Sequence, residues 1–202
     1  MKDRTWLTQL IIQPIMIVVS ILAALAVNNW QEARATGKRV AAARAAFVNE
    51  ISANKQLLLS ANYLPHHRKL KADYDAAIKN NAADPGTFFD TGLHPTPLRD
   101  SSYRMLSGSA TLMELPSGFV LALTDIYRLQ DSIEKSNEGF LNALYAPRSD
   151  RDTPGYAKDV ARSIALFLAD LVPAEETLLK SYDHVLERFA ADKPPWGDEL
   201  AK

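Results

Sequence analysis

The chain has 202 residues, no cysteine, and 23 Lys and Arg against 24 Asp and Glu, which gives a formal net charge of −1. Without cysteine, disulfides, thiolate nucleophiles and zinc–thiolate sites are excluded, and the redox compartment stays open. The balanced charge provides no overall attraction to nucleic acid, so we expect no nucleic-acid partner. The length after the first 30 residues suits one domain with its own hydrophobic core.

The amino-terminal region contains an apolar run from Trp6 to Val27, 22 residues without a charged side chain. As a helix this run would be about 33 Å long, close to the roughly 30 Å hydrocarbon core of a bilayer. Trp6 and Trp30 bracket the run, and tryptophan prefers the membrane interface. The sequence therefore predicts a single transmembrane helix, with the lipid bilayer as a partner.

Two alternatives to a membrane anchor remain open. Basic residues near Met1 and the Ala24-Leu25-Ala26 pattern are typical of a cleaved signal peptide. Against cleavage, the run is longer than the usual apolar core of about 7 to 15 residues, and residues 31–54 favour continuation of the same helix. A buried helix of a soluble protein is less favoured, because nothing later in the chain offers enough apolar surface to surround it.

The side of the membrane that the domain faces is also open. Positive-inside counting favours a cytoplasmic domain, because two basic residues precede the run and four follow it: Lys2 and Arg4 against Arg34, Lys38, Arg39 and Arg44. Long following domains, however, cross the membrane largely regardless of charge.

Helical spacing of apolar residues predicts one long helix from the membrane to about Asn62 and a second from Pro65 to Ile78, ending at Asn80-Asn81. Proline and glycine in residues 82–97 predict a surface loop, with a lid or partner-docking loop as the alternative; Thr87-Phe88-Phe89 is its apolar patch.

A short helix is expected from Leu98 to Ser107, stopping at Gly108. Pro116 then opens a helix whose side chains alternate by four and three in a heptad seam: Phe119, Leu123, Ile126, Gln130, Ile133, Asn137, Phe140 and Leu144. Polar seam positions such as Gln130 and Asn137 more often fix register or partner than bind ligands.

After a polar loop at 147–154, the last helix carries one apolar face: Val160, Ile164, Phe167, Leu171, Leu178, Tyr182, Val185 and Phe189. Pro173 is expected to kink or divide this helix. With almost no alternating strand pattern, the sequence predicts an all-α protein: a membrane anchor (1–30), an antiparallel helical bundle (31–192) and a tail (193–202).

The candidates for chemistry are few. His66 and His67 are adjacent, so on a helix they would point about 100° apart, and His94 and His184 stand alone. Carboxylates on helix faces are expected to be solvated: Glu175, Glu176, Asp131, Glu134 and Glu138. We therefore assign no catalytic, cofactor-binding or metal-binding residue, expect no cofactor, and predict a protein that is not an enzyme.

Two stretches carry a resemblance. Residues 17–34 end the apolar helix in Asn29-Trp30-Gln31-Glu32, and residues 103–112 with Leu121 to Tyr127 downstream form an aromatic-x-x-Leu turn followed by a helix. Both are similar to a group of uncharacterised bacterial membrane-anchored proteins with an Asn-Trp-x-Glu motif after the anchor. The resemblance implies a protein of the bacterial inner membrane and transfers no catalytic residue.

Two functions fit these features. A membrane-tethered interaction or assembly module, acting through a homo-oligomer or another membrane protein, is favoured by the heptad seam. A membrane-anchored sensory or ligand-responsive domain is the alternative, because an uninterrupted helix could carry a displacement between bilayer and domain.

We predict that removing residues 1–27 releases the protein from membranes, because this deletion takes away the apolar run. A reporter fused after Lys202 should sediment with membranes in the full-length chain and stay soluble in the truncated one. A mature amino terminus at Val27 would instead identify a cleaved signal peptide.

Overall fold

The computed structural model describes residues 4–80, 92–146 and 155–191, with side chains from residue 14 to residue 190 within these ranges. All regular secondary structure in these ranges is helical, so the predicted all-α class is confirmed. The helices are α1 (Arg4–Leu59), α2 (Leu64–Lys79), α4 (Ser101–Leu106), α5 (Ala110–Glu114), α6 (Ser117–Tyr145) and α7 (Tyr156–Ala191).

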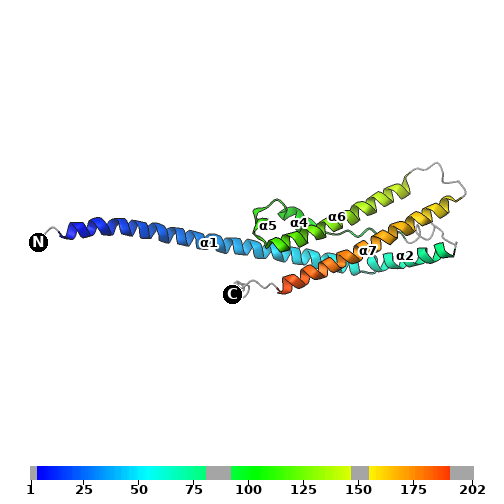
Figure 1. Cartoon of the computed structure of the whole chain (residues 1–202), viewed down its shortest axis with the longest axis horizontal. Coiled ribbons are helices and arrows are strands. Elements are labelled where there is room, and N and C mark those ends of the chain that lie inside the picture. Colours follow the sequence, from blue (N-terminus) through cyan, green and yellow to red (C-terminus); the bar gives the residue numbers. More distant parts are fainter. Residues whose placement is uncertain (1–3, 81–91, 147–154, 192–202) are drawn as a thin grey trace.

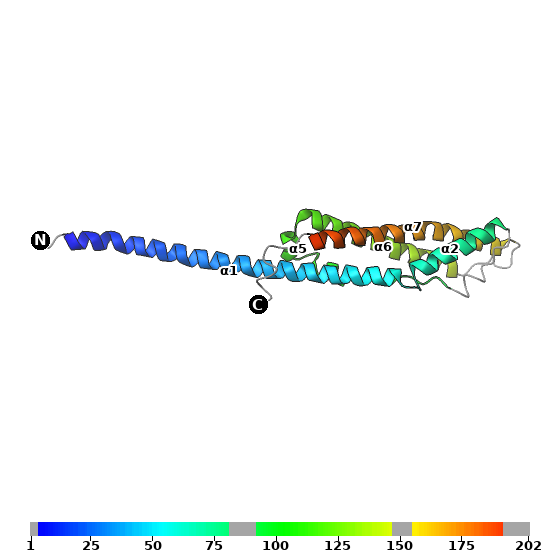
Figure 2. The ribbon, with the colours of Figure 1, turned by 90° about the horizontal axis from the view of Figure 1, so that it is seen from below.

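The long helices form an elongated bundle around α7 (Figure 1). α1 enters the bundle with its carboxyl-terminal half, and α2 continues the same course away from the amino terminus (Figure 2). α6 runs in the same direction, whereas α7 returns antiparallel and packs against α1, α2 and α6. The short helices α4 and α5 pack on α1 at the end of the bundle nearer the amino terminus.

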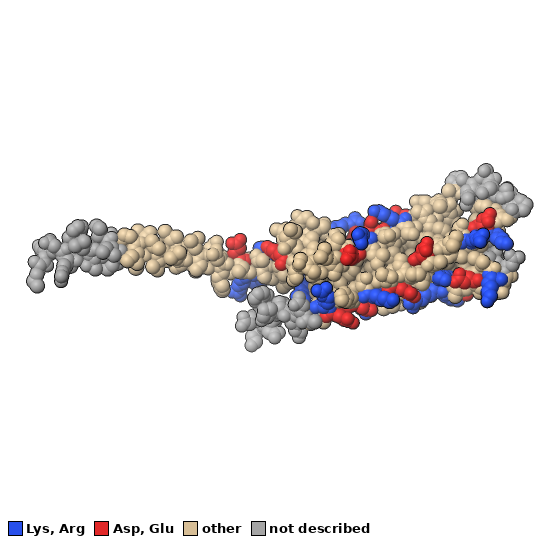
Figure 3. Space-filling view, in the orientation of Figure 1, with Lys and Arg blue, Asp and Glu red and all other residues tan. Residues whose placement is uncertain are grey.

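The amino-terminal part of α1 stands clear of the bundle. Each large apolar side chain from Ile15 to Val27 is more than half exposed, and Thr36 is the first residue that the bundle partly covers. This stretch is long and apolar enough to cross a membrane, and none of it is buried against the described part of the chain. In Figure 3 it lacks charged side chains, which begin where α1 approaches the bundle. A core helix of a soluble protein would be covered, so that alternative does not fit.

The observed helix ends follow the chemistry of the chain closely. α1 ends at Leu59, three residues before Asn62, and α2 begins at Leu64 with Pro65 in its first turn, where a missing N–H costs nothing. α6 begins directly after Pro116. The expected short helix is narrower, Ser101–Leu106, and α5 was not expected. The expected loop at 147–154, the 193–202 tail and the Thr87-Phe88-Phe89 patch lie outside the described residues.

The heptad seam of α6 is buried inside the molecule. Six of its eight members are buried and the two phenylalanines are partly buried. Phe140 stacks on Phe167 of α7, with ring centroids 4.0 Å apart. The seam therefore closes the bundle within one chain, and it does not present a free surface for a second copy.

The predicted division of the last helix at Pro173 is wrong, because α7 is one helix of 36 residues. Proline removes the hydrogen bond to the carbonyl four residues earlier, which is that of Ala169. Ala169 and Pro173 both lie on the exposed face of α7, where water can satisfy that carbonyl. The expected apolar face of α7 is buried along its whole length.

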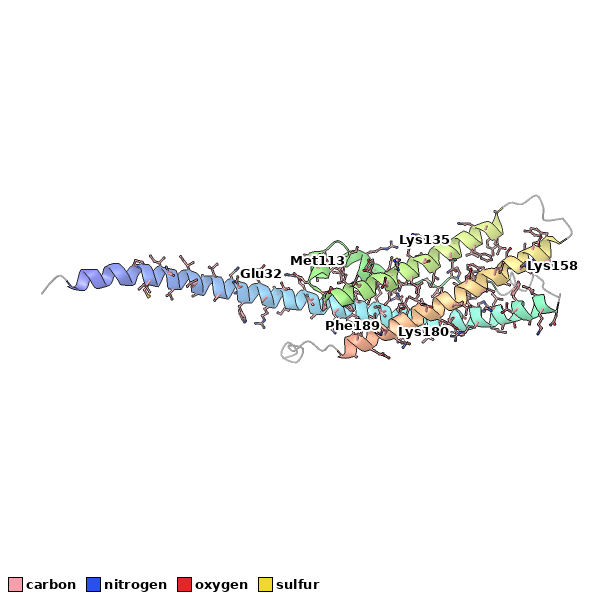
Figure 4. All side chains as sticks on the ribbon, in the orientation of Figure 1. Glu32, Met113, Lys135, Lys158, Lys180 and Phe189 are labelled. Carbon is pink, nitrogen blue, oxygen red and sulfur yellow. The ribbon has the colours of Figure 1, made fainter. Side chains whose placement is uncertain are left out.

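An aromatic cluster joins α1, α6 and α7 near the exposed part of α1. Phe119 of α6 lies edge-on to Phe189 of α7 at 4.1 Å and to Phe47 of α1 at 6.2 Å. Arg44 of α1 donates to the backbone oxygen of Phe189 at 3.1 Å and lies over its ring (Figure 4). A cation beside the last carbonyls of a helix is favourable, so α7 ends against α1.

Replacing Leu123 with Ala should lower the free energy of unfolding by about 2 to 5 kcal/mol, because the side chain is fully buried in the seam. Leu121 on the same helix is 66% exposed, and its replacement with Ala should change stability by less than about 0.5 kcal/mol. Chemical unfolding of both full-length variants in detergent micelles measures the difference. Equal losses would contradict the register of α6.

Candidate functional site

A stretch of extended chain is buried in the helical bundle. Residues 92–100, here called the return segment, carry the chain from the far end of α2 back to α4. Gly92 has φ +72°, a left-handed conformation that glycine adopts without strain, and its carbonyl lies 2.9 Å from Nε2 of His66. Leu93 and Thr96 are buried. A buried segment that is neither helix nor strand needs side chains to satisfy its polar groups.

A buried histidine–glutamate pair holds the middle of the return segment. Nδ1 of His67 on α2 lies 2.9 and 3.0 Å from the two carboxyl oxygens of Glu175 on α7. Nε2 of His67 lies 3.1 Å from the backbone oxygen of His94, and Thr96 donates its hydroxyl proton to Glu175 at 3.3 Å. His67 and Glu175 are both completely buried.

The geometry of this pair fixes its number of protons. The carbonyl oxygen of His94 can only accept, so Nε2 of His67 carries a proton. Between Nδ1 and the carboxyl group of Glu175 there must be a second proton, on either partner, because two bare acceptors would repel. The pair is therefore neutral as a whole, which lowers the cost of burying it.

Three expectations about histidines and carboxylates are corrected here. Glu175 is buried rather than solvated, and His67 is a core residue rather than a solvated or helix-terminal one. His94 is not alone, because its ring stacks on that of His66 with centroids 4.8 Å apart. Sequence reasoning missed this meeting because a loop and α2 are brought together by the return of the chain. His184, by contrast, lies exposed on α7 as expected.

These histidines do not form a metal centre. Both ring nitrogens of His67 already have hydrogen-bond partners, which leaves no lone pair for a metal. Within the described ranges, no group of three or more potential ligands is placed to hold a metal ion. The cluster instead attaches the return segment to α2 and α7.

Two buried polar residues of α1 hold the rest of the segment. The side-chain amide of Asn54 donates to the backbone oxygen of Arg99 at 2.7 Å and accepts from its N–H at 2.8 Å. Asn54 thus pairs with the extended chain as a neighbouring strand would. Glu50 accepts from the Ser101 hydroxyl at 2.6 Å and from the Ser102 N–H at 2.8 Å, which caps the start of α4.

Glu50 also links α1 to α6, because the hydroxyl of Tyr127 donates to it at 2.7 Å. Burial alone would raise the pKa of Glu50, but its hydrogen bonds from Ser101, Ser102 and Tyr127 outweigh burial and hold that pKa below the ordinary 4.5. Burial, together with the bond to Glu50, raises the pKa of the Tyr127 hydroxyl. Glu50 is therefore a buried carboxylate with a full set of donors.

The polar row continues into α7. Gln130 of α6 donates to the hydroxyl of Tyr182 at 2.6 Å, and Tyr182 also bonds with Asn54. Burial raises the pKa of Tyr182 despite these bonds. Two acceptors in the buried seam have no partner among the described residues: Oε1 of Gln130 and Oδ1 of Asn137. An unpaired buried acceptor is costly, so each of these oxygens lacks a donor that it should have.

A groove of about 490 Å³ opens between α4 and α6, beside the end of the return segment. Its aromatic wall is formed by Tyr103 and Tyr127, whose rings stack at 4.5 Å. Its polar wall includes Gln130 and five charged residues: Asp100, Arg104, Arg128, Asp131 and Glu134. This groove is the strongest candidate for a binding site, because it combines an aromatic surface, charges and an unpaired buried acceptor.

Comparison of the chain with protein-family models, curated proteins and solved structures finds no match. The site therefore has to be interpreted from its own geometry.

The sequence contained a signal for Glu50 and Asn54 that was not used. Both lie on the apolar stripe of α1 that includes Phe47, Ile51 and Leu58. Polar residues on a buried stripe require buried partners, which is the reasoning already applied to Gln130 in α6.

Replacing Glu50 with Gln should lower the free energy of unfolding at neutral pH by about 1 to 3 kcal/mol, because three donors lose a charged acceptor. The folded-state pKa is lowered, so ionised Glu50 stabilises fully above 4.5, and this stabilisation is lost as the pH falls through the lower folded-state value. The difference between the parent and E50Q should therefore shrink as the pH falls below 4.5.

Urea unfolding of the full chain in detergent micelles between neutral and acidic pH measures this difference. The exposed Glu187 of α7 provides a control, and its replacement with Gln should have little effect at any pH. A gap that widened in acid would contradict the role of Glu50.

Proposed function

We propose that this protein is a membrane-tethered helical interaction module. The observation that carries the proposal is that one unbroken helix, α1, contains both the uncovered apolar stretch and a buried face of the bundle. A continuous helix holds its two ends at a fixed separation, because a bend requires a break in its hydrogen bonds. The bundle would therefore stand at a set height above the bilayer.

The height of the bundle follows from the helix rise. Arg39 lies nine residues beyond Trp30, which corresponds to about 13 Å along the axis. At that level Arg39 forms an ion pair with Glu114 of α5 at 3.4 Å. The short helices α4 and α5 would thus face the space just above the membrane surface, where neighbouring membrane proteins are within reach.

The exposed methionines of these helices support a partner at this level. Met113 of α5 is 85% exposed and Met105 of α4 is 70% exposed. Figure 4 places Met113 at the end of the bundle that faces the uncovered part of α1. Methionine is flexible and polarisable, and it is common at surfaces that bind proteins. We call this pair of residues the methionine corner and assign it to contact with another membrane protein.

The proposal includes a location in the bacterial inner membrane. Its support is the resemblance carried by residues 17–34, in which the apolar helix ends in Asn29-Trp30-Gln31-Glu32. It assigns no catalytic role, because the buried carboxylates Glu50 and Glu175 have their oxygens committed to donors in and beside the return segment.

A sensory or ligand-responsive domain is the second candidate, and the groove between α4 and α6 favours it. A ligand there would contact α6 and α4, and Glu50 connects both of these helices to α1. Binding could therefore bias the position of the helix that enters the membrane.

The interaction module is tested by photo-crosslinking in intact membranes. A photoreactive residue replacing Met113 should form an adduct of defined mass with another membrane protein, because the methionine corner contacts it. The same residue replacing Leu166, which is 64% exposed on α7 away from the corner, is the matched control. Equal adducts from both positions, or none from position 113, would contradict the proposal; an adduct of twice the chain mass would identify a second copy.

A further inference from the structure

The groove between α4 and α6 contains an acceptor that the protein itself does not satisfy. Gln130 borders the groove, is 5% exposed, and uses its amide N–H to reach Tyr182 on α7. Its Oε1 atom has no partner among the described residues. An amide oxygen can only accept, so the missing group is a hydrogen-bond donor. The groove is the open space that Gln130 borders, and a donor would have to arrive through it.

The charges along the groove favour a cation. Three carboxylates line it, those of Asp100, Asp131 and Glu134. Asp100 is paired with Arg104, and Asp131 is paired with Lys135 at 2.8 Å. Glu134 has no ion pair in the described ranges, which makes it the carboxylate available to an incoming charge.

The two arginines of the groove do not neutralise this carboxylate. Arg104 is held by Asp100, whose hydrogen bond and charge are the main reasons why the pKa of Arg104 is raised; Glu134 adds a smaller effect. Arg128 lies 3.6 Å from Asp125 and is thus drawn along α6. The lining as a whole has three negative and two positive side chains. A net negative charge remains.

The aromatic wall suits the same kind of ligand. Tyr103 and Tyr127 stack at 4.5 Å, and Tyr127 is fixed by its bond to Glu50. Aromatic faces attract ammonium groups and also cover aliphatic carbon. A molecule with an N–H donor at one end, a short aliphatic body and a positive charge would meet all three features.

We propose that the groove between α4 and α6 binds a small organic ammonium compound of the aliphatic diamine class, with one amine donating to Oε1 of Gln130 and the other facing Glu134. This inference goes beyond the proposed interaction module and does not depend on it, because the groove and the methionine corner are different surfaces.

The test is isothermal titration calorimetry on the purified full chain in detergent micelles, with 1,4-diaminobutane as the probe. We expect saturable binding with a dissociation constant on the order of 1 mM or lower. Butane-1,4-diol, which has donors but no charge, should bind at least about tenfold more weakly because it lacks attraction to Glu134.

Two variants examine the two ends of the site. Glu134→Gln removes the charge from an exposed position and should weaken the diamine by about threefold or more. Gln130→Met removes the buried acceptor at similar size and should weaken it by about tenfold. Circular dichroism melting shows whether Gln130→Met is still folded, and Glu134→Gln tests the proposal without that risk.

Glu138→Gln is the matched control, because Glu138 lies exposed one turn further along α6 and does not line the groove. Its affinity for the diamine should equal that of the parent protein. The proposal is overturned by the absence of saturable binding, by equal binding of the diol, or by equal weakening in Glu134→Gln and Glu138→Gln, which would indicate general attraction to an acidic surface.

Discussion

Extended chain buried among helices has no neighbouring strand to pair with, so every covered N–H and C=O must find a side chain. The return segment meets this constraint through polar residues on α1, α2 and α7, chiefly Asn54, His67 and Glu175. Each of them is buried only because the segment supplies its hydrogen bonds, and the segment is buried only because they supply its own. Removal of one partner would leave a buried polar group unsatisfied, which is the costly outcome. The bundle and its irregular segment therefore stabilise one another.

This mutual dependence also shapes the surface that could bind a ligand. Glu50 holds the start of α4 and orients Tyr127, so one carboxylate places both the α4 side and the aromatic wall of the groove. Glu50 lies on the same helix as the uncovered apolar stretch. Anchor, core and groove are thus connected through α1, which gives a physical route between the bilayer and the groove without a flexible joint.

The helices were predictable because local rules determine them. Pro65 and Pro116 begin helices, Asn80 ends one, and the seam of α6 was identified down to its polar members. Pro173 failed as a predictor, because its effect depends on whether the freed carbonyl faces water. The site was largely missed for a similar reason. Charge is a good guide to exposure on average, yet Glu175 is buried because a histidine from another helix neutralises it.

The sequence by itself determined the apolar anchor run, the helical class, the course of the main helices and the faces that they bury, since these follow from periodicity and from residue chemistry within a few turns. Tertiary structure decided which polar residues meet. His67 and Glu175 are separated by 108 residues, and Glu50 and Tyr127 by 77. Such pairs depend on the path of the return segment through the bundle, and that path is set by the joint satisfaction of its buried backbone groups, which no local pattern encodes.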